Sequence, residues 1–329
     1  MAAMRPCRRA GVNAMPGRAI LCAMSSNPGL PQLFDREAFR RNRARTAAGL
    51  DGHDFLFREA AERLADRLDD LRRRFPLALD LGSHGGILAR TLKGRGGIET
   101  LIVSDPALAL ARRAGPLAVV ADEELLPFSG GRFDLVMSAL ALHWTNDLPG
   151  ALIQIRHALK PDGLLLASLF GRETLRELRR ALLEAEAEES GGASPRVSPF
   201  VDVPDAGALL QRAGFALPVV DSDLVTVTYP NALALMRDLR AMGESNALRD
   251  RTRRMTRRGV LLRAAAIYER LFADAAGRIP ATFQIVTLTA WAPHGSQQKP
   301  LRPGSAAARL ADALGSAEKP AGDKTPRRG

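Results

Sequence analysis

Hydrophobic runs of strand length alternate with segments of helical periodicity between residues 77 and 170. Strands that alternate with helices are typical of a parallel sheet with helices on both faces. The expected strands are residues 77–81, 101–105, 117–121, 133–138 and 163–170. A turn is expected at residues 159–162, where Pro161 interrupts the pattern. The pattern predicts an α/β fold built on a doubly wound, mostly parallel sheet.

Further elements are expected on both sides of this region. Two helices, residues 35–48 and 54–74, precede the first strand. After the fifth strand come helical patterns at 173–189, 231–242 and 259–275, a short helix through Leu210, and strand-like stretches at 223–229 and 282–291. The two late strands complete a seven-stranded sheet. The segments 172–215 and 230–280, which interrupt the sheet pattern, form either a lid over the strand ends or ordinary packing.

These elements divide the chain into parts of different character. The expected parts are a leader at 1–34, N-terminal helices at 35–75, a sheet domain at 76–291 with helical insertions at 172–215 and 230–280, and a disordered tail at 292–329. The arginines of the leader resemble a mitochondrial transit peptide. Alternatively, translation starts at Met24 in a GC-rich bacterial gene, which we favour. A bacterial protein is expected in the cytoplasm, and a eukaryotic one in the mitochondrial matrix.

The turn after the first strand carries the candidate chemistry. In a parallel sheet, ligands bind at such strand-to-helix turns, and glycine lets the backbone approach them closely. A dinucleotide site requires Gly-x-Gly-x-x-Gly, but the chain has His84 and Ile87 where the second and third glycines belong. Asp80, Gly82 and Gly86 instead resemble the first motif of class I S-adenosylmethionine-dependent methyltransferases, Asp-Leu-Gly-x-Gly-x-Gly, with His84 in place of the middle glycine.

Acids also follow the next two strands. Asp105 lies 23 residues after Gly82, near the offset of roughly 20 residues at which an acid binds a ribose hydroxyl. By position, Asp122 and Glu123 would lie beside the adenine of S-adenosylmethionine, and Asp80 at its methionine end. The other interpretation makes Asp80 and Asp105 helix caps, and the two remaining acids parts of a surface turn.

Composition narrows the classes of function. The chain has 329 residues, of which 46% are hydrophobic, and a net charge of +11. Residues 1–46 carry nine arginines and two acids, and residues 292–329 carry seven basic and three acidic residues. Residues 47–291 therefore hold 31 basic and 31 acidic residues, which does not indicate a nucleic-acid groove. No apolar run is long enough for a transmembrane helix.

Motifs along residues 33–306 resemble one family within the methyltransferase superfamily. The shared segments are residues 80–86, 121–128, 142–149, 159–163, 198–200, 242–246 and 280–285. Through these segments the chain resembles the family of mitochondrial complex I assembly factor 5 and its bacterial relatives. Residues 242–246, Met-Gly-Glu-Ser-Asn, distinguish that family from the malonyl carrier-protein O-methyltransferases, which share the earlier motifs.

The resemblance implies a class I methyltransferase fold that binds S-adenosylmethionine. It also implies the hydroxylation of an arginine on a subunit of the quinone-reducing arm of respiratory complex I. Two alternatives stay open. One is methyl transfer to a malonyl carrier protein or a small carboxylate, as in biotin synthesis, and the other is a non-catalytic assembly chaperone. The five histidines have no paired ligand spacing, so no metal site is predicted. Residues and spacing do not supply an oxidant for hydroxylation.

Two candidate groups lie on the acceptor side. His143 follows the fourth strand and is a candidate general base, with Trp144 as a pocket wall. Glu244 and Asn246 are candidates to hold an arginine substrate, because carboxylates pair well with guanidinium. Turn and capping roles are the alternatives for these four residues. The six arginines between 249 and 258 form either a solvated helix face or a docking patch for an acidic protein surface.

Overall fold

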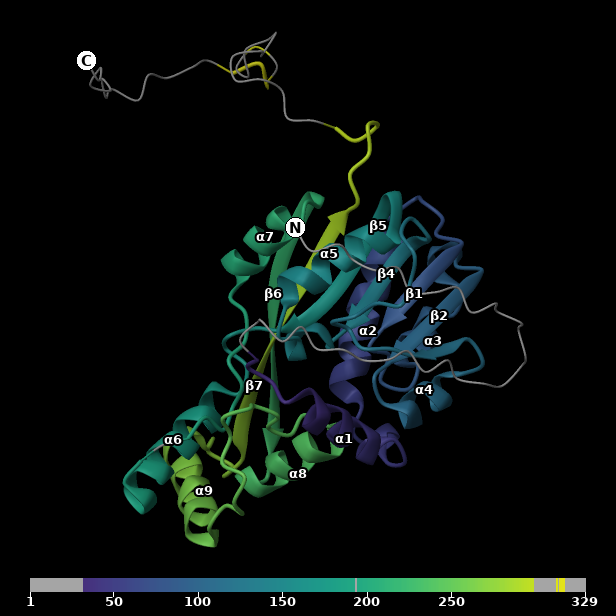
Figure 1. The fold of residues 1–329 in the computed structure, drawn as a ribbon. Helices are drawn as coiled ribbons and strands as arrows, with labels where there is room; N and C mark the ends of the chain where they lie inside the picture. Colours follow the sequence, from purple (N-terminus) through teal and green to yellow (C-terminus); the bar gives the residue numbers. More distant parts are fainter. Residues whose placement is uncertain (1–31, 193, 299–311, 313, 317–329) are drawn as a thin grey trace, which may run out of the picture. The chain divides into compact units, whose positions relative to one another are not determined.

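A computed structural model describes residues 32–192, 194–298, 312 and 314–316. The chain divides into two compact units, Met1–Pro293 and His294–Gly329, and every labelled helix and strand belongs to the first (Figure 1). Most of the expected leader, residues 1–31, and most of the expected tail lie outside the described residues. In the described part of the chain, no helix is long and apolar enough to cross a membrane.

The strands of the described residues form one seven-stranded sheet. They are β1 (Leu77–Leu81), β2 (Thr100–Asp105), β3 (Ala118–Val120), β4 (Phe133–Ala139), β5 (Leu159–Phe170), β6 (Ala216–Tyr229) and β7 (Ile279–Trp291). Their order is β3-β2-β1-β4-β5-β7-β6. The first five pair in parallel, whereas β7 is antiparallel to both β5 and β6. The prediction of a doubly wound, mostly parallel sheet is confirmed.

Helices cover both faces of this sheet. They are α1 (Arg36–Thr46), α2 (Phe55–Asp69), α3 (Ile87–Leu92), α4 (Leu108–Ala114), α5 (Leu148–Ala158), α6 (Arg176–Ser190), α7 (Val203–Arg212), α8 (Ala232–Met242) and α9 (Arg258–Phe272). Short 3-10 turns lie at Leu50–Gly52, Arg95–Gly97 and Leu142–Trp144. Several helices begin at capping side chains: Asp35 accepts from Ala38 N–H, and Asp147 accepts from Gly150 N–H.

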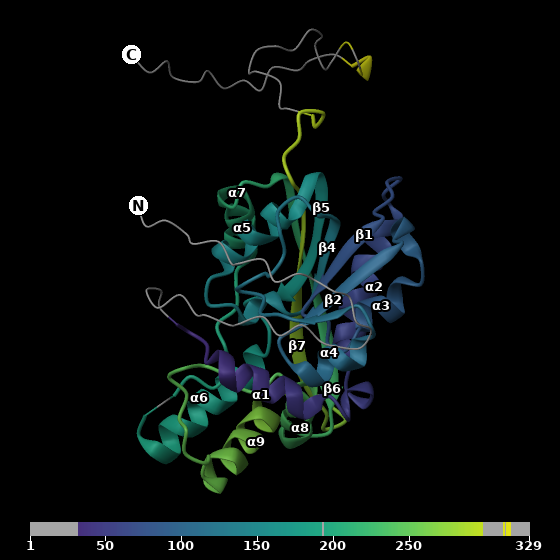
Figure 2. The same cartoon turned by 45° about the vertical axis from the view of Figure 1, so that its right-hand side comes forward.

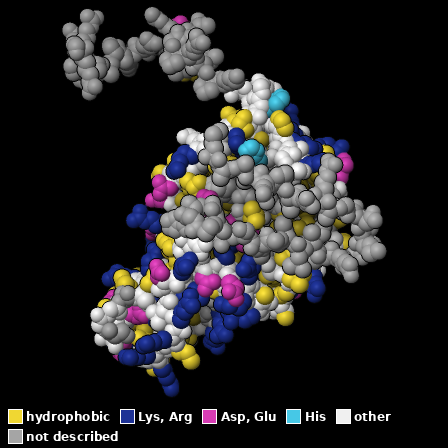
Figure 3. Space-filling view, in the orientation of Figure 1, with side chains coloured by type: hydrophobic (Ala, Val, Ile, Leu, Met, Phe, Trp, Pro, Cys, Tyr) yellow, Lys and Arg dark blue, Asp and Glu magenta, His cyan; other side chains and the backbone are white. Residues whose placement is uncertain are grey.

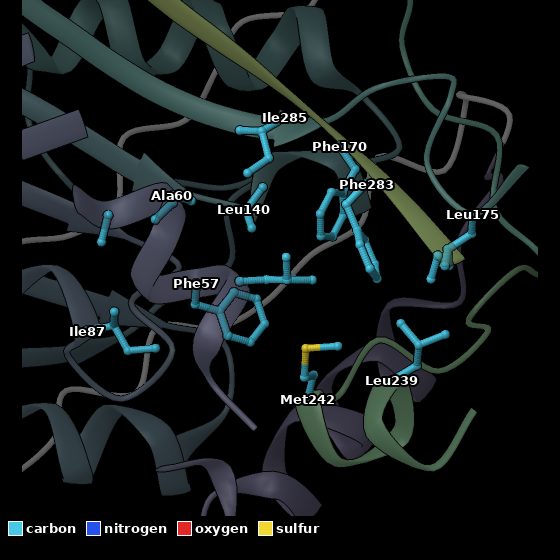
Figure 4. Packing of buried hydrophobic residues seen from close by; sticks show 14 of the residues in the cluster. Phe57, Ala60, Ile87, Leu140, Phe170, Leu175, Leu239, Met242, Phe283 and Ile285 are labelled. Carbon is cyan, nitrogen blue, oxygen red and sulfur yellow. The ribbon is translucent and has the colours of Figure 1, made fainter. Parts of the chain in front are cut away.

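Two buried hydrophobic clusters hold the helices to the sheet. One joins α2 and α3 to one face of the sheet and continues to α6, α8 and α9. The other joins α5 and α7 to the opposite face. Figure 4 shows the first cluster, which includes Phe57 of α2, Leu239 and Met242 of α8, and Phe170 and Phe283 of β5 and β7. The helices inserted after β5 and β6 are thus packed into the core of the fold.

Helices α1, α6, α8 and α9 gather at one end of the sheet in both ribbon views (Figures 1 and 2). This end includes the carboxyl end of β5 and the start of β7. The two helices of the insertion at 172–215 lie in different places. Helix α6 is at this end of the sheet, whereas α7 packs through Ala206 and Leu210 on one face of the sheet. Helices α6, α8 and α9 lie at this end and also pack into the first hydrophobic cluster, so the lid over the strand ends stays a hypothesis.

Three expected boundaries were wrong. Helix α2 ends at Asp69 rather than at residue 74, because Phe75, which is fully buried, must enter the core before β1. Residues 159–162 belong to β5, although Asp162 has a φ of 62°. The N–H of Asp162 donates to the carbonyl of Ala292, so the turn stays joined to the adjoining strand. Strand β6 begins at Ala216, seven residues earlier than expected.

Candidate active site

The glycine turn after β1 is tightly packed. Gly82 has a φ of +75°, and a Cβ at this position would lie 2.2 Å from the Cβ of Ala141. Gly86 has a φ of +82° and lies close to the backbone of Ala114. His84 has a φ of 48°, and its ring stacks on Phe57 with 3.8 Å between centroids. The turn therefore demands glycine at Gly82, and it tolerates His84 because the ring is directed into the core.

The predicted cofactor acids are brought together at the ends of β1, β2 and β3, and all are buried. Neither carboxylate oxygen of Asp80 accepts a hydrogen bond from a described residue, and Oε1 of Glu123 is also unpartnered. Burial, with the nearby charge of Asp105, raises the pKa of Asp80 to about 8. Burial likewise raises the pKa of Glu123 to about 7, although Arg36 opposes the shift. Buried polar atoms without partners are uncommon, so these three oxygens are acceptors that remain free to bind a ligand.

Two arginines of α1 form ion pairs with these acids, and neither was identified from the sequence. Arg43 is 2% exposed and pairs with Asp105, while one of its nitrogens lies 3.0 Å from Nδ1 of His84. Arg36 pairs with Asp122 and with Oε2 of Glu123. The two arginines are seven residues apart, a spacing that places both on one face of a helix. That spacing was the signal available in the sequence.

On the acceptor side, the side chains of His143 and Glu244 lie next to each other. Oε2 of Glu244 accepts a hydrogen bond of 2.9 Å from Nε1 of Trp144 and lies 3.3 Å from Nε2 of His143. The other oxygen of Glu244 has no hydrogen-bond partner among the described residues. The ring of Trp144 packs against Phe34 and Phe39, so the N-terminal segment also supports this side of the site.

A cavity of about 430 Å³ opens beside Glu244. Its walls include the aromatic rings of Trp144, Phe170 and Phe200 and aliphatic side chains such as Leu239. Asn246 also lines the cavity, but its amide nitrogen donates to Pro195 and its oxygen accepts from the N–H of Leu248. Because the polar atoms of Asn246 bind the backbone of the protein itself, Glu244 is the better placed of the two to bind a substrate.

Among the arginines between 249 and 258, the first two bind residues of the N-terminal segment. Arg249 donates to Gln32, and Arg251 pairs with Asp35 of the α1 cap. Further along, Met255 is 96% exposed between neighbouring arginines. Figure 3 shows Lys and Arg side chains mixed with Asp and Glu on the part of the surface where α1, α6 and α9 lie. The docking patch for an acidic surface therefore stays a hypothesis for the distal part of this run.

No group of three or more His, Cys, Asp or Glu side chains within the described ranges is arranged to hold a metal ion. Two observations, in contrast, fit a bound S-adenosylmethionine. The unpartnered carboxylate of Asp80 provides acceptors for an ammonium group. Gly82, with its φ of +75°, gives the turn beside Asp80 a backbone conformation that side chains rarely adopt.

Comparison with known proteins places this site in context. A family profile described as "Methyltransferase domain" matches residues 79–167. Arginine-hydroxylase NDUFAF5, mitochondrial, of Danio rerio is 44% identical over 297 residues, which cover 88% of this chain and 92% of the relative. The Homo sapiens protein of the same name is 43% identical, covering 86% and 83%. A malonyl-[acyl-carrier protein] O-methyltransferase of Xylella fastidiosa is 38% identical, covering 79% and 89%.

Proposed function

The chain belongs to the family of the arginine-hydroxylase NDUFAF5, within the S-adenosylmethionine-dependent methyltransferase superfamily, and from that premise we propose that it modifies an arginine side chain of a respiratory complex I subunit during assembly. The hypothesis rests on the named relatives together with the resemblance of residues 242–246. The modification proposed is hydroxylation, as in the relatives' name. Hydroxylation inserts one oxygen atom into an N–H or C–H bond of the arginine, so it requires a two-electron oxidant such as molecular oxygen, together with an electron donor that reduces the second oxygen atom to water.

One observation carries the choice of an arginine. Glu244 is a carboxylate with a side-chain exposure of 8%, and no lysine or arginine of the described residues forms an ion pair with it, although the charge of Arg43 acts on it from a greater distance. Trp144 and His143 hold one of its oxygens. A buried carboxylate is costly unless a cation compensates it, and guanidinium is the cation whose geometry matches a carboxylate best. The aliphatic part of an arginine would lie along the apolar walls of the cavity.

S-adenosylmethionine, the cofactor of this superfamily, supplies a sulfonium with an activated methyl group when it is bound. We assign Asp80 to its ammonium, Gly82 and Gly86 to the close backbone approach, and Asp105 to the ribose hydroxyls. Asp122 and Glu123 are assigned to the adenine side. His143 lies beside Glu244, where it can accept or return a proton of the guanidinium.

A carboxylate substrate is the second candidate. The relatives named malonyl-[acyl-carrier protein] O-methyltransferase support it, and so does Arg240, an exposed cation that lines the same cavity. The charge of Glu244 argues against it, because it would repel a second carboxylate in the same cavity. The arginine substrate is therefore the better match to this site.

Deletion of the gene, followed by mass spectrometry of the complex I subunits, tests the proposed function. We expect one arginine to lose the mass of a single oxygen atom relative to the parent strain. If the deletion strain instead requires biotin, the carboxylate alternative is correct. If complex I assembly fails while every arginine keeps its mass, the chain acts as an assembly chaperone.

A further inference from the structure

Asp105 is saturated with hydrogen bonds in this structure. An ionised carboxylate has about four acceptor positions. Oδ1 accepts from the N–H of Ala107 at 2.9 Å and from Nε of Arg43 at 3.4 Å. Oδ2 accepts from the N–H of His84 at 3.2 Å and from a terminal nitrogen of Arg43. A pair of ribose hydroxyls can therefore bind Asp105 only after Arg43 has released it.

Arg43 is held firmly in this position. Burial, followed by the charge of Arg43, lowers the pKa of His84 well below its usual value, so that the ring is neutral. Nε2 of His84 lies 3.1 Å from the carbonyl of Leu140, which leaves Nδ1 to accept a hydrogen bond from Arg43. A guanidinium that loses Asp105 cannot stay buried in its present position without another anion. The other carboxylates whose charges act on Arg43 are Glu123, which already pairs with Arg36, and Glu244, which forms no ion pair with Arg43 in this position. Release of Asp105 therefore requires Arg43, and with it α1, to move.

We propose that α1 is a displaceable cover of the cofactor site, in which Arg43 holds Asp105 until the ribose hydroxyls of S-adenosylmethionine replace it. This inference rests on the cofactor assignment made under the proposed function and not on the identity of the substrate. Cofactor then binds only to molecules in which α1 has moved away from Asp105. The measured affinity is therefore lower than the affinity of these open molecules, in proportion to the fraction that is open.

The same helix contacts the acceptor side. The amide nitrogen of Asn42 donates to the carbonyl of Ser245 at 3.2 Å, and the N–H of Asp35 donates to Ala247 at 2.8 Å. Phe39 of α1 lies 5.4 Å from the ring of Trp144, measured between centroids. Movement of α1 away from Asp105 thus loosens residues 242–246 and exposes Trp144. Cofactor binding and access to the cavity beside Glu244 are coupled through one element.

Substitution of Arg43 tests the cover, with binding as the readout. Arg43→Gln should bind S-adenosylhomocysteine about tenfold more tightly than the unchanged protein, because the closed state loses its strongest contact with Asp105. Arg41→Gln is the matched control on the same helix, since Arg41 pairs only with exposed Glu37 among the described contacts. We expect its affinity to be unchanged. Isothermal calorimetry measures all three proteins, and weaker or equal binding by Arg43→Gln would overturn the proposal.

A kinetic measurement keeps the test independent of whether that variant folds. Trp291→Phe leaves Trp144 as the only tryptophan in the chain. In stopped-flow experiments on this protein, the observed rate of the Trp144 fluorescence change should reach a plateau as the concentration of S-adenosylhomocysteine rises, because opening of α1 limits the rate. A rate that rises linearly throughout would contradict the cover. Neither readout depends on complex I, so a failed arginine modification leaves this test intact.

Discussion

The cofactor side and the acceptor side of the site bury their carboxylates differently. On the cofactor side, Arg36 and Arg43 of α1 compensate Asp105, Asp122 and Glu123. On the acceptor side, Glu244 is held by an indole N–H and an imidazole ring. A carboxylate already paired with a cation must exchange partners before it binds a ligand, whereas Glu244 can accept a cation directly. Apart from Asp80, which has no hydrogen-bond partner among the described residues, the cofactor side is thus built for exchange, and the acceptor side is built to receive a positive charge.

The largest expected effect concerns the glycine turn on the cofactor side. Gly82→Ala places a Cβ 2.2 Å from that of Ala141 and forces a positive φ. We expect a loss of about 2–6 kcal/mol in the free energy of unfolding, together with loss of measurable cofactor binding. Gly94→Ala is the matched control, because Gly94 also has a positive φ but open space around it. Equal effects of both substitutions on cofactor binding would show that the contact with Ala141 is irrelevant.

The ion pair between Arg43 and Asp105 gives the next effect. Asp105→Ala leaves a buried guanidinium without its partner, which costs about 3–5 kcal/mol of stability. Removing both charges in Asp105→Ala/Arg43→Met should restore most of that loss, because an apolar pair avoids desolvation. Urea unfolding of the two variants measures the difference. A double variant no more stable than Asp105→Ala would mean that the charge of Arg43 is not what the single substitution exposes.

A change of pH is expected to have a smaller effect on the free energy of unfolding. The pKa of Asp80 is raised to about 8 in the folded protein, from 3.8. The folded state therefore binds more protons than the unfolded state between these values, and stability falls as pH rises through this window. The slope is at most about 1.4 kcal/mol per pH unit for one group. Asp80→Asn removes this ionisation, so its stability should depend less on pH between 6 and about 8. Parallel profiles for both proteins would contradict the assignment of the shift to Asp80.

The cofactor side was largely predictable from the sequence because its signals are local. A strand followed by Gly82 specifies the backbone of the turn, and Asp105 follows its own strand at a regular offset. The partner of Asp105 was not predictable from such signals, because Arg43 lies 62 residues away in the sequence. Its charge was counted with the basic N-terminal region, although it is buried.

On the acceptor side, His143 and Trp144 were candidates because they follow the fourth strand, whereas residues 242–246 were singled out through the resemblance. Trp144 and Glu244 are 100 residues apart, and their contact depends on how α8 packs against the sheet. Hydrophobic periodicity predicts that α8 exists, but it does not specify which strand ends the helix covers. The short segment 242–246 was informative because of its residue types, and the fold explains its location.

The central claim is that Glu244 binds the arginine substrate. It is tested most directly in cells whose only copy carries Glu244→Gln, which keeps the shape and removes the charge. The matched control is Glu269→Gln on the exposed part of α9. Mass spectrometry of complex I should show the oxygen on the target arginine in the control and its loss in Glu244→Gln, while the purified variant still binds S-adenosylhomocysteine. Full modification in the Glu244→Gln cells would contradict the account.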